Sequence, residues 1–372
     1  MIRYTPSEII VLDAGRVINS PVTENILNNL AGRDIPVSRL SREQVDARIE
    51  RLRSLDDPFR EGKKVLLITE NDGEFLKRCP GTNEYICCDY YIIDFAQNCP
   101  MDCTYCILQA YLNNPMMVVY ANIGDLTAEL DRRLPATGGT MRIGTGEFTD
   151  SLALEHLTQY SDLLMNYFEK KPEYLIEFKT KTDNVETFLK RKPPANVLLS
   201  WSVNAGNVTS REELKSATLD ERLAAAKKCA DAGYKITLHF DPVIDYEDFD
   251  AQMEKTVESI FSHLRPESVK YVSLGCYRFI PKLRDIVAAR FPNTNIIYNE
   301  FIKGYDGKSR YFRKKRERLF KKLYDLIKKR DPDNRIALYF CMESPEIWKA
   351  VAGSSPGSDE ELGRTLYENC VE

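Results

Sequence analysis

The pattern of apolar and polar residues predicts alternating strands and helices along most of the chain. From residue 90 onward, short runs rich in Ile, Val, Tyr and Phe alternate with longer segments that have the 3.6-residue period of amphipathic helices. This alternation is typical of βα units that build a parallel sheet. The predicted strands of this series are Tyr91–Phe95, Met141–Gly144, Tyr174–Lys179, Val197–Val203, Ile236–Phe240 and Tyr271–Leu274.

Helical patterns lie between these strands and on both sides of the series. A helix over Arg42–Leu55 is expected to begin after Ser41, because Gln44 three residues later completes a capping-box pattern. The other predicted helices are Thr23–Leu30, Leu152–Tyr167, Thr218–Ala232, Asp248–Phe261 and Tyr311–Lys329. Strands outside the series are predicted at Ile9–Asp13, Val65–Thr69, Ile296–Tyr298 and Ile336–Phe340.

Six consecutive βα units predict an α/β fold with a partial (β/α)6 barrel of the TIM type. In such a barrel the chemistry lies at the C-terminal ends of the strands. An open doubly wound sheet is the alternative, because periodicity does not distinguish the two. We divide the chain into an N-terminal α/β extension at 1–89, the barrel core at 90–304, and a C-terminal extension at 305–372 with a basic helix and a closing strand and helix.

The composition of the 372 residues restricts the class of protein. The net charge is −4 and the pI is about 5.7, so the chain as a whole does not indicate nucleic-acid binding. The N-terminal segment lacks the pattern of a signal peptide, and no apolar run approaches the roughly 20 residues of a membrane span. With ten cysteines and no signal, we expect reduced thiols in a cytoplasmic protein.

Three cysteines follow the first strand of the series in the stretch NCPMDCTYC, at C-x3-C-x2-C spacing. Buried core thiols are one interpretation, but polar residues separate these cysteines. Structural zinc is another, but it needs four closed ligands. A [4Fe–4S] cluster on three thiolates leaves one iron open to a ligand, which explains the missing fourth cysteine. We therefore predict a cluster on Cys99, Cys103 and Cys106.

This motif, followed by a barrel, resembles the radical S-adenosylmethionine (SAM) superfamily. The resemblance implies that SAM binds the open iron through its amino and carboxylate groups. It also implies reductive cleavage of SAM to methionine and a 5′-deoxyadenosyl radical, with an electron donor of the flavodoxin or ferredoxin type.

Stretches at the next strand ends are similar to the superfamily's SAM contacts. RIGTGEFTDS resembles a Gly-Gly-Glu segment that faces the SAM amino group, although a simple turn capped by Asp150 is the alternative. Of the two lysines in EFKTKTD, Lys181 suits the SAM carboxylate better than Lys179. SWSVNAG supplies two partners for the ribose hydroxyls. The implied SAM contacts are Gly144, Thr145, Gly146, Glu147, Lys181, Ser202 and Asn204.

Nearly the whole chain resembles the spore photoproduct lyase family, in the stretches EGKKVLLITEN, FTDSLALEH, FKTKTDNVE, SWSVNA and GKSRYF. The resemblance implies a carbon–carbon lyase that repairs a methylene-bridged thymine dimer in DNA. In that reaction the adenosyl radical takes a hydrogen from C6, the bridge breaks, and a cysteine quenches the thymine radical. A tyrosine pair relays the hydrogen, and Tyr105 matches one member of the pair.

Two positions depart from the family's pattern. Glu147 stands where the hydrogen-donor cysteine is expected, and Ile107 replaces the second tyrosine. A carboxylate cannot substitute for the thiol, because its O–H bond is far stronger. Either another thiol donates, with Cys276 and Cys341 as candidates and buried core positions as the alternative, or the enzyme acts on a different nucleic acid, a peptide or a small molecule.

A basic segment predicts contact with a polyanion. Residues 308–330 carry twelve Lys and Arg against two acidic residues, with apolar residues at helical spacing. We expect Arg310 and Arg313 to contact DNA phosphates and Tyr311 to stack against an extruded base. A solvated helix face is the alternative.

His239 and Asp241 lie two residues apart at the end of the fifth strand, and therefore on the same side of it. Two ligands without a third do not indicate a metal, so we expect a hydrogen-bonded contact to substrate or SAM. A buried core histidine is the alternative. For the whole protein, the alternative to an enzyme is a non-catalytic iron–sulfur protein that binds nucleic acid.

Overall fold

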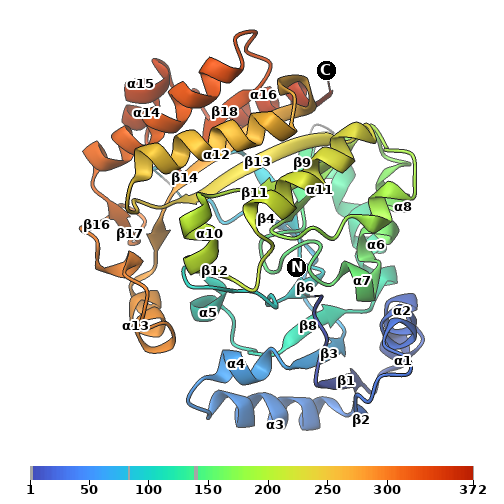
Figure 1. Ribbon diagram of the computed structural model, residues 1–372. Helices are drawn as coiled ribbons and strands as arrows, with labels where there is room; N and C mark the ends of the chain where they lie inside the picture. Colours follow the sequence, from blue (N-terminus) through green and yellow to red (C-terminus); the bar gives the residue numbers. More distant parts are fainter. Residues whose placement is uncertain (1–2, 83, 138–140, 372) are drawn as a thin grey trace.

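The structure is a computed structural model that describes residues 3–82, 84–137 and 141–371, and its largest sheet has eight strands (Figure 1). The strands follow the order β18-β14-β13-β11-β10-β9-β5-β4, and only β4 runs antiparallel to its neighbour. Their bounds are β4 (Leu76–Arg78), β5 (Tyr90–Ile93), β9 (Met141–Gly144), β10 (Tyr174–Thr180), β11 (Val197–Ser202), β13 (Lys235–Val243), β14 (Val269–Cys276) and β18 (Ala337–Phe340).

The order of these strands separates the two folds that periodicity left open. From β5 to β18 the neighbours follow chain order, as in a barrel, whereas a doubly wound sheet reverses its order at a switch point. The sheet is curled, with helices such as α11 (Leu219–Asp231) and α12 (Phe249–His263) on its outer side (Figure 1). The six strands predicted for the series are therefore present as the consecutive strands β5, β9, β10, β11, β13 and β14 of a partial barrel.

A second, five-stranded sheet lies at the N-terminal side of the molecule, at the bottom of Figure 1. Its order is β2-β1-β3-β8-β6, and only β6 is antiparallel to its neighbour. Two of these strands follow residue 89 in the chain, so the sheet draws on both sides of the predicted domain boundary. The bounds are β1 (Glu8–Leu12), β2 (Val37–Leu40), β3 (Val65–Thr69), β6 (Ala96–Gln97) and β8 (Met117–Tyr120).

Two small antiparallel sheets complete the strand structure. One pairs β7 (Asp102–Cys103) with β12 (Glu213–Leu214), and thereby ties the cysteine loop to the segment after β11. The other joins β15 (Arg278–Phe279), β17 (Ser309–Tyr311) and β16 (Phe301–Lys303).

The helices mostly follow the predicted pattern. Ser41 and Gln44 form the expected capping box of α3, because each side chain accepts a hydrogen bond from the other residue's backbone N–H. The remaining bounds are α1 (Gly15–Ile18), α2 (Pro21–Asn29), α3 (Arg42–Arg53), α4 (Pro58–Gly62), α5 (Leu108–Tyr111), α6 (Ile123–Arg133), α7 (Glu155–Thr158), α8 (Tyr160–Phe168), α9 (Glu186–Leu189), α10 (Gly206–Glu212), α13 (Pro281–Arg290), α14 (Arg313–Arg330), α15 (Pro345–Ala352) and α16 (Asp359–Val371).

Three predicted elements are wrong in type or extent. The predicted strand Ile296–Tyr298 is a 3-10 helix. The predicted helix Leu152–Tyr167 is interrupted at Gln159, which has a φ of 51°. The C-terminal basic helix begins at Arg313, since Tyr311 lies in β17. Among the residues that the structure describes, no helix has both the length and the apolar character needed to cross a membrane.

Candidate active site

The three cysteines of the motif share one loop between β6 and α5. Asn98, in the left-handed region with a φ of 69°, begins this loop and accepts a hydrogen bond from the Cys99 N–H. The Cys106 N–H donates to the carbonyl of Cys103 at 3.1 Å, which closes a turn around the motif. All three are free thiols, and burial raises the pKa of the Cys103 thiol to about 12. Cys99 and Cys106 both pack against the small buried cluster that contains Cys103.

A buried carboxylate fixes the position of this loop. Asp102 accepts hydrogen bonds from Lys63 at 2.8 Å and from Lys215 at 2.6 Å, and Arg290 lies 3.4 Å away. Burial raises the pKa of the Asp102 carboxyl, but the two ammonium groups outweigh this effect and hold the pKa below its ordinary value. The cysteine loop is therefore connected by ion pairs to the N-terminal extension, to the segment after β12 and to α13.

Three free thiols on one loop supply the ligand type of an iron–sulfur cluster, which is cysteine thiolate, although the described residues hold no group of three or more His, Cys, Asp or Glu side chains already gathered around a metal position. They pack with Met101 and Ala153 in a small apolar cluster, and an apolar surround limits solvent access to such a site. Iron binding would have to displace the thiol protons, because thiolates are the ligands.

Tyr105 is held beside the loop by its hydroxyl group. The hydroxyl donates to Glu213 at 2.5 Å, and Glu213 forms a buried ion pair of 2.6 Å with Arg222. The ammonium group of Lys181 lies 5.8 Å from the centre of the Tyr105 ring. Within the described part of the chain, no carboxylate lies within 4.0 Å of that ammonium group. The predicted carboxylate-binding lysine is thus next to the cluster loop and available for an anion.

The predicted glycine-rich segment follows β9 at the same rim of the barrel. The Glu147 carboxylate lies 2.5 Å from the Lys179 ammonium, at the end of the neighbouring strand β10. Burial lowers the pKa of Lys179, but Glu147 outweighs this effect and raises the pKa above its ordinary value. A Cβ atom at Gly146 would lie 2.9 Å from the Cβ of Lys179, so glycine permits this close approach. Glu147 is therefore already paired with a cation of the protein.

His239 belongs to a buried polar network inside the barrel. Its Nε2 lies 2.9 Å from Glu177, which also accepts hydrogen bonds from Tyr90 and Tyr271, each at 2.6 Å. Burial raises the pKa of Glu177, but His239 and Arg142 outweigh it and hold the pKa well below its ordinary value. His239 therefore has a partner within the protein, as the core-histidine alternative expects.

A family model described as spore photoproduct lyase matches residues 11–341 of the sequence. The chain belongs to the spore photoproduct lyase family. Two curated relatives named spore photoproduct lyase come from Geobacillus sp. and from Bacillus subtilis (strain 168), and each is 25% identical to this chain. The first match covers 222 residues, which are 58% of this chain and 64% of the relative, and the second covers 215 residues, 56% and 63%. The matches thus span slightly less than two thirds of these relatives.

Solved structures of spore photoproduct lyases share the fold. One is complexed with dinucleoside spore photoproduct and has a TM-score of 0.78 at 19% identity, over 91% of this chain and 100% of that chain. Another is a mutant with bound AdoMet and dinucleoside spore photoproduct, with a TM-score of 0.79 at 19% identity and the same coverage. The predicted family and the predicted partial barrel are confirmed. The predicted lyase class, [4Fe–4S] cluster and SAM agree with the cofactors and class of this family.

The other residues predicted to contact SAM differ in whether their side chains already have hydrogen-bond partners within the protein. Thr145 is buried and donates to Ser151 at 2.7 Å, while Gly144 faces the Tyr90 ring. The Asn204 amide donates to the carbonyl of Pro242 at 2.9 Å and accepts from a backbone N–H, so both of its ends are occupied. Ser202 is buried at the end of β11. The roles proposed for these residues stay predictions.

Two residues expected to contact DNA lie inside the protein. Arg310 is 2% exposed and donates to Asp306 at 2.6 Å, and Tyr311 is fully buried. Both residues belong to β17 and are buried, so neither side chain reaches solvent, contrary to the prediction. Arg313 is exposed but pairs with Glu317 at 2.6 Å. Asp241 lies 3.4 Å from the Arg278 guanidinium.

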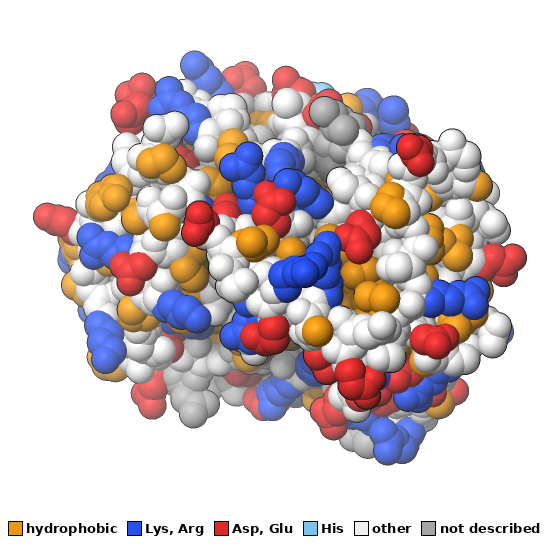
Figure 2. Space-filling view, turned by 90° about the horizontal axis from the view of Figure 1, so that it is seen from below, with side chains coloured by type: hydrophobic (Ala, Val, Ile, Leu, Met, Phe, Trp, Pro, Cys, Tyr) orange, Lys and Arg blue, Asp and Glu red, His pale blue; other side chains and the backbone are white. Residues whose placement is uncertain are grey.

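Acidic residues neutralise much of the predicted basic face. Lys315 and Arg318 of α14 both pair with Asp245, at 2.7 and 2.9 Å, and Lys322 pairs with Glu254 of α12. The face seen from below in Figure 2, which lies away from α14, also carries Lys and Arg side chains interspersed with Asp and Glu. The charge of α14 is thus a weaker argument for DNA contact than the sequence suggested.

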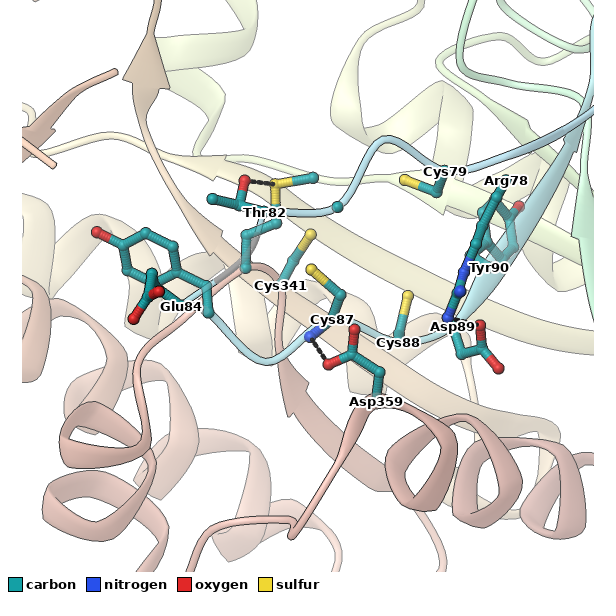
Figure 3. Close-up of a pocket in the computed structure, with 13 residues that line it drawn as sticks. Arg78, Cys79, Thr82, Glu84, Cys87, Cys88, Asp89, Tyr90, Cys341 and Asp359 are labelled. Carbon is teal, nitrogen blue, oxygen red and sulfur yellow. Dashed lines mark hydrogen bonds and ion pairs between the residues drawn. The ribbon is translucent and has the colours of Figure 1, made fainter. Parts of the chain in front are cut away.

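The structure also gathers cysteines that sequence spacing does not connect. A cavity of about 420 Å³ is lined by thiols from the loop between β4 and β5 and from the end of β18 (Figure 3). These cysteines are Cys79, Cys87, Cys88 and Cys341. Cys341 was predicted as a candidate donor. Cys276, the other candidate, is 2% exposed and packs in the apolar core. No sequence motif marks Cys79, because only its neighbours in the fold distinguish it from the other cysteines.

Proposed function

We propose that the protein is a radical SAM enzyme that repairs a methylene-bridged thymine dimer in DNA. The observation that carries the proposal is the set of three free thiols packed in one small cluster on one loop of a chain that belongs to the spore photoproduct lyase family. Solved relatives named for a bound dinucleoside spore photoproduct and for bound AdoMet support the choice of substrate and cofactor.

Cys99, Cys103 and Cys106 would hold the [4Fe–4S] cluster, and Lys181 would bind the SAM carboxylate beside it. When bound and reduced, these groups supply a 5′-deoxyadenosyl radical. The chain's own part is to place the SAM anion against an ammonium group and to exclude solvent with Met101 and Ala153. Tyr105, held by Glu213 between the cluster loop and Lys181, is the residue that would relay a hydrogen atom.

The test is product analysis after anaerobic reconstitution with iron, sulfide, SAM, a strong reductant and a spore-photoproduct dinucleotide. We expect 5′-deoxyadenosine and thymidylyl-thymidine by LC–MS. Cys103→Ala should abolish both products, whereas Cys229→Ala, a thiol removed from the middle of α11, should retain them. SAM cleavage by Cys103→Ala would refute the cluster assignment.

The alternative proposal is that the enzyme acts on a different substrate. Glu147 favours this alternative, because the family's donor cysteine is absent at this position. Formation of 5′-deoxyadenosine without thymidylyl-thymidine would reject dimer repair and retain the radical chemistry. A DNA duplex that carries the lesion should then be compared with the dinucleotide, because Lys315 and Arg318 of α14 are already paired with Asp245 and only a duplex tests a contact with DNA.

A further inference from the structure

The absence of a thiol at position 147 raises the question of which residue donates the final hydrogen atom. Any substitute must lie beside Glu147, since that is where the family's donor is expected. Contacts of β4 identify such a place. The ammonium group of Lys77, in β4, lies 5.1 Å from the centre of the Phe148 ring, and Phe148 directly follows Glu147. The end of β4 is therefore beside the Glu147 segment, although 70 residues separate them in the chain.

Cys79 is the thiol at this end of β4. Residues 77 and 79 point to the same side of an extended chain, so the Cys79 side chain is on the side that carries Lys77 toward Phe148. The Cys79 N–H donates to the carbonyl of Tyr90 at 2.8 Å, which continues the β4–β5 ladder by one residue. The side chain of Tyr90 crosses Gly144, three residues before Glu147. The contact of Lys77 with Phe148 and the ladder through Tyr90 thus bring the end of β4, and Cys79 directly after it, near the segment 144–148.

The charges around Cys79 agree with this placement. Burial raises the pKa of the Cys79 thiol, and the nearby Glu147 carboxylate raises it further, while Lys179 acts in the opposite direction. The net effect keeps the sulfur protonated at neutral pH. A thiol must carry its hydrogen to donate a hydrogen atom, so this environment suits a donor.

We propose that Cys79 donates the hydrogen atom that completes repair, in place of the cysteine that Glu147 replaces. The inference rests on the proposed function. The Sγ–H bond of Cys79 breaks and a C–H bond forms on the methylene carbon of the thymine radical, so one proton and one electron move together and no net charge is transferred. The thiyl radical left on Cys79 takes one electron from the flavodoxin- or ferredoxin-type donor and one proton from solvent, which restores the thiol.

The other thiols of the cavity provide matched controls. In Figure 3 the side chains of Cys79, Cys87, Cys88 and Cys341 all point toward the cavity from different parts of its wall. Cys87 lies beside Asp359, because its backbone N–H donates to that carboxylate at 2.8 Å. Cys341 lies 3.5 Å from the guanidinium of Arg278. Neither has a contact with the Glu147 segment among the described residues.

The experiment compares Cys79→Ala with Cys87→Ala and Cys341→Ala in a single turnover in D₂O. The wild-type protein should place one deuterium in the thymine methyl group, because the thiol exchanges with solvent. Cys79→Ala should still form 5′-deoxyadenosine, which shows that it folds and binds its cofactors. Its ratio of thymidylyl-thymidine to 5′-deoxyadenosine should fall about tenfold or more, and the labelled product should be lost. Cys87→Ala, the control, should keep both ratio and label, and Cys341→Ala, which tests the rival donor, should keep them as well when Cys79 is the donor.

A second readout needs no cluster. The spore-photoproduct dinucleotide should protect Cys79 from alkylation by iodoacetamide in the cluster-free protein, as measured by peptide mass spectrometry. Unchanged repair and label in Cys79→Ala, or loss of both in Cys341→Ala instead, would overturn the assignment of Cys79 alone. A wild-type protein that neither repairs the dinucleotide nor binds it would overturn the proposed function, and the donor assignment with it.

Discussion

Gly144 is the position where the structure tolerates a side chain least, and Gly144→Ala tests the packing of the barrel interior. A Cβ atom at this position would lie 1.5 Å from the hydroxyl oxygen of Tyr90 and 2.3 Å from its Cζ atom. Tyr90 is 7% exposed, so its ring cannot move into solvent without opening the barrel wall. The ring must therefore shift, and its hydrogen bond to Glu177 must break.

The expected loss has two parts. Overpacking of a filled interior costs about 1–3 kcal/mol. Loss of a hydrogen bond from Tyr90 to the buried, ionised Glu177 costs about 1.5–3 kcal/mol more. We therefore expect Gly144→Ala to lower the free energy of unfolding by about 3–5 kcal/mol, which is a large share of the stability of an ordinary domain.

The assay is urea unfolding of the cluster-free protein, followed by circular dichroism under reducing conditions. Gly124→Ala is the matched control, because no atom lies within 4 Å of the added Cβ and the residue lies in α6. That control should gain up to about 1 kcal/mol. In a double-mutant cycle, Tyr90→Phe should cost less in the Gly144→Ala background than in the wild type, since the hydroxyl group has already lost its partner. A loss below about 1 kcal/mol in Gly144→Ala would mean that Tyr90 does not cross β9 at this point.

Three further changes test other parts of the site. Lys181→Ala should weaken SAM binding by roughly 10- to 100-fold in equilibrium dialysis, with the absorbance of the cluster unchanged, because a charge-assisted contact to the carboxylate is lost. Asp102→Asn should lower the free energy of unfolding by about 3 kcal/mol and reduce the iron content after reconstitution, because Lys63 and Lys215 then lack their shared anion. Burial raises the pKa of Glu155 to about 7 from 4.5, so the folded protein takes up a proton between these values. The contribution of Glu155 to the free energy of unfolding should then be greatest below about pH 4.5 and fall by about 3 kcal/mol as the pH rises to about 7. Glu155→Gln should remove this slope in urea unfolding at a series of pH values.

The sequence predicted those parts of the fold that depend on local periodicity. The strands of the barrel are long apolar runs, and the capping box of α3 is a signal contained within four residues. The strand predicted at Ile296–Tyr298 is only three residues long, and so short a run has no readable period. The break at Gln159 depends on distant residues. The amides of Asn25 and Asn29 donate to the carbonyls of Thr158 and Leu157, which satisfies the end of α7 and permits the chain to turn.

For the candidate site as well, the sequence predicted what depends on local spacing and missed what depends on contacts between distant residues. The cluster motif lies within eight residues, so its spacing alone indicated its chemistry. The basic segment was misjudged because its acidic partners, such as Asp245 and Glu254, lie in or near another helix. Likewise, nothing near Cys79 in the sequence distinguishes it from the other cysteines. Its position beside Glu147 arises only when β4 pairs with β5 and β5 with β9.

The pairing of Glu147 with Lys179 explains how the barrel can accept a carboxylate at the position where the resemblance predicts the donor thiol. A half-buried carboxylate is costly without a cation, and Lys179 supplies one at 2.5 Å from the end of the next strand. Gly146 is needed for that approach, because a side chain there would collide with Lys179. The substitution is therefore compensated locally and need not disturb the rim of the barrel. The Glu147 carboxylate cannot supply the hydrogen atom of the missing thiol. A repair enzyme with Glu147 at this position therefore needs a thiol on a neighbouring part of the barrel wall. Cys79, directly after β4, meets both conditions, since the β4–β5 ladder brings it near the same segment from outside the β9–β10 pair and leaves the ion pair intact.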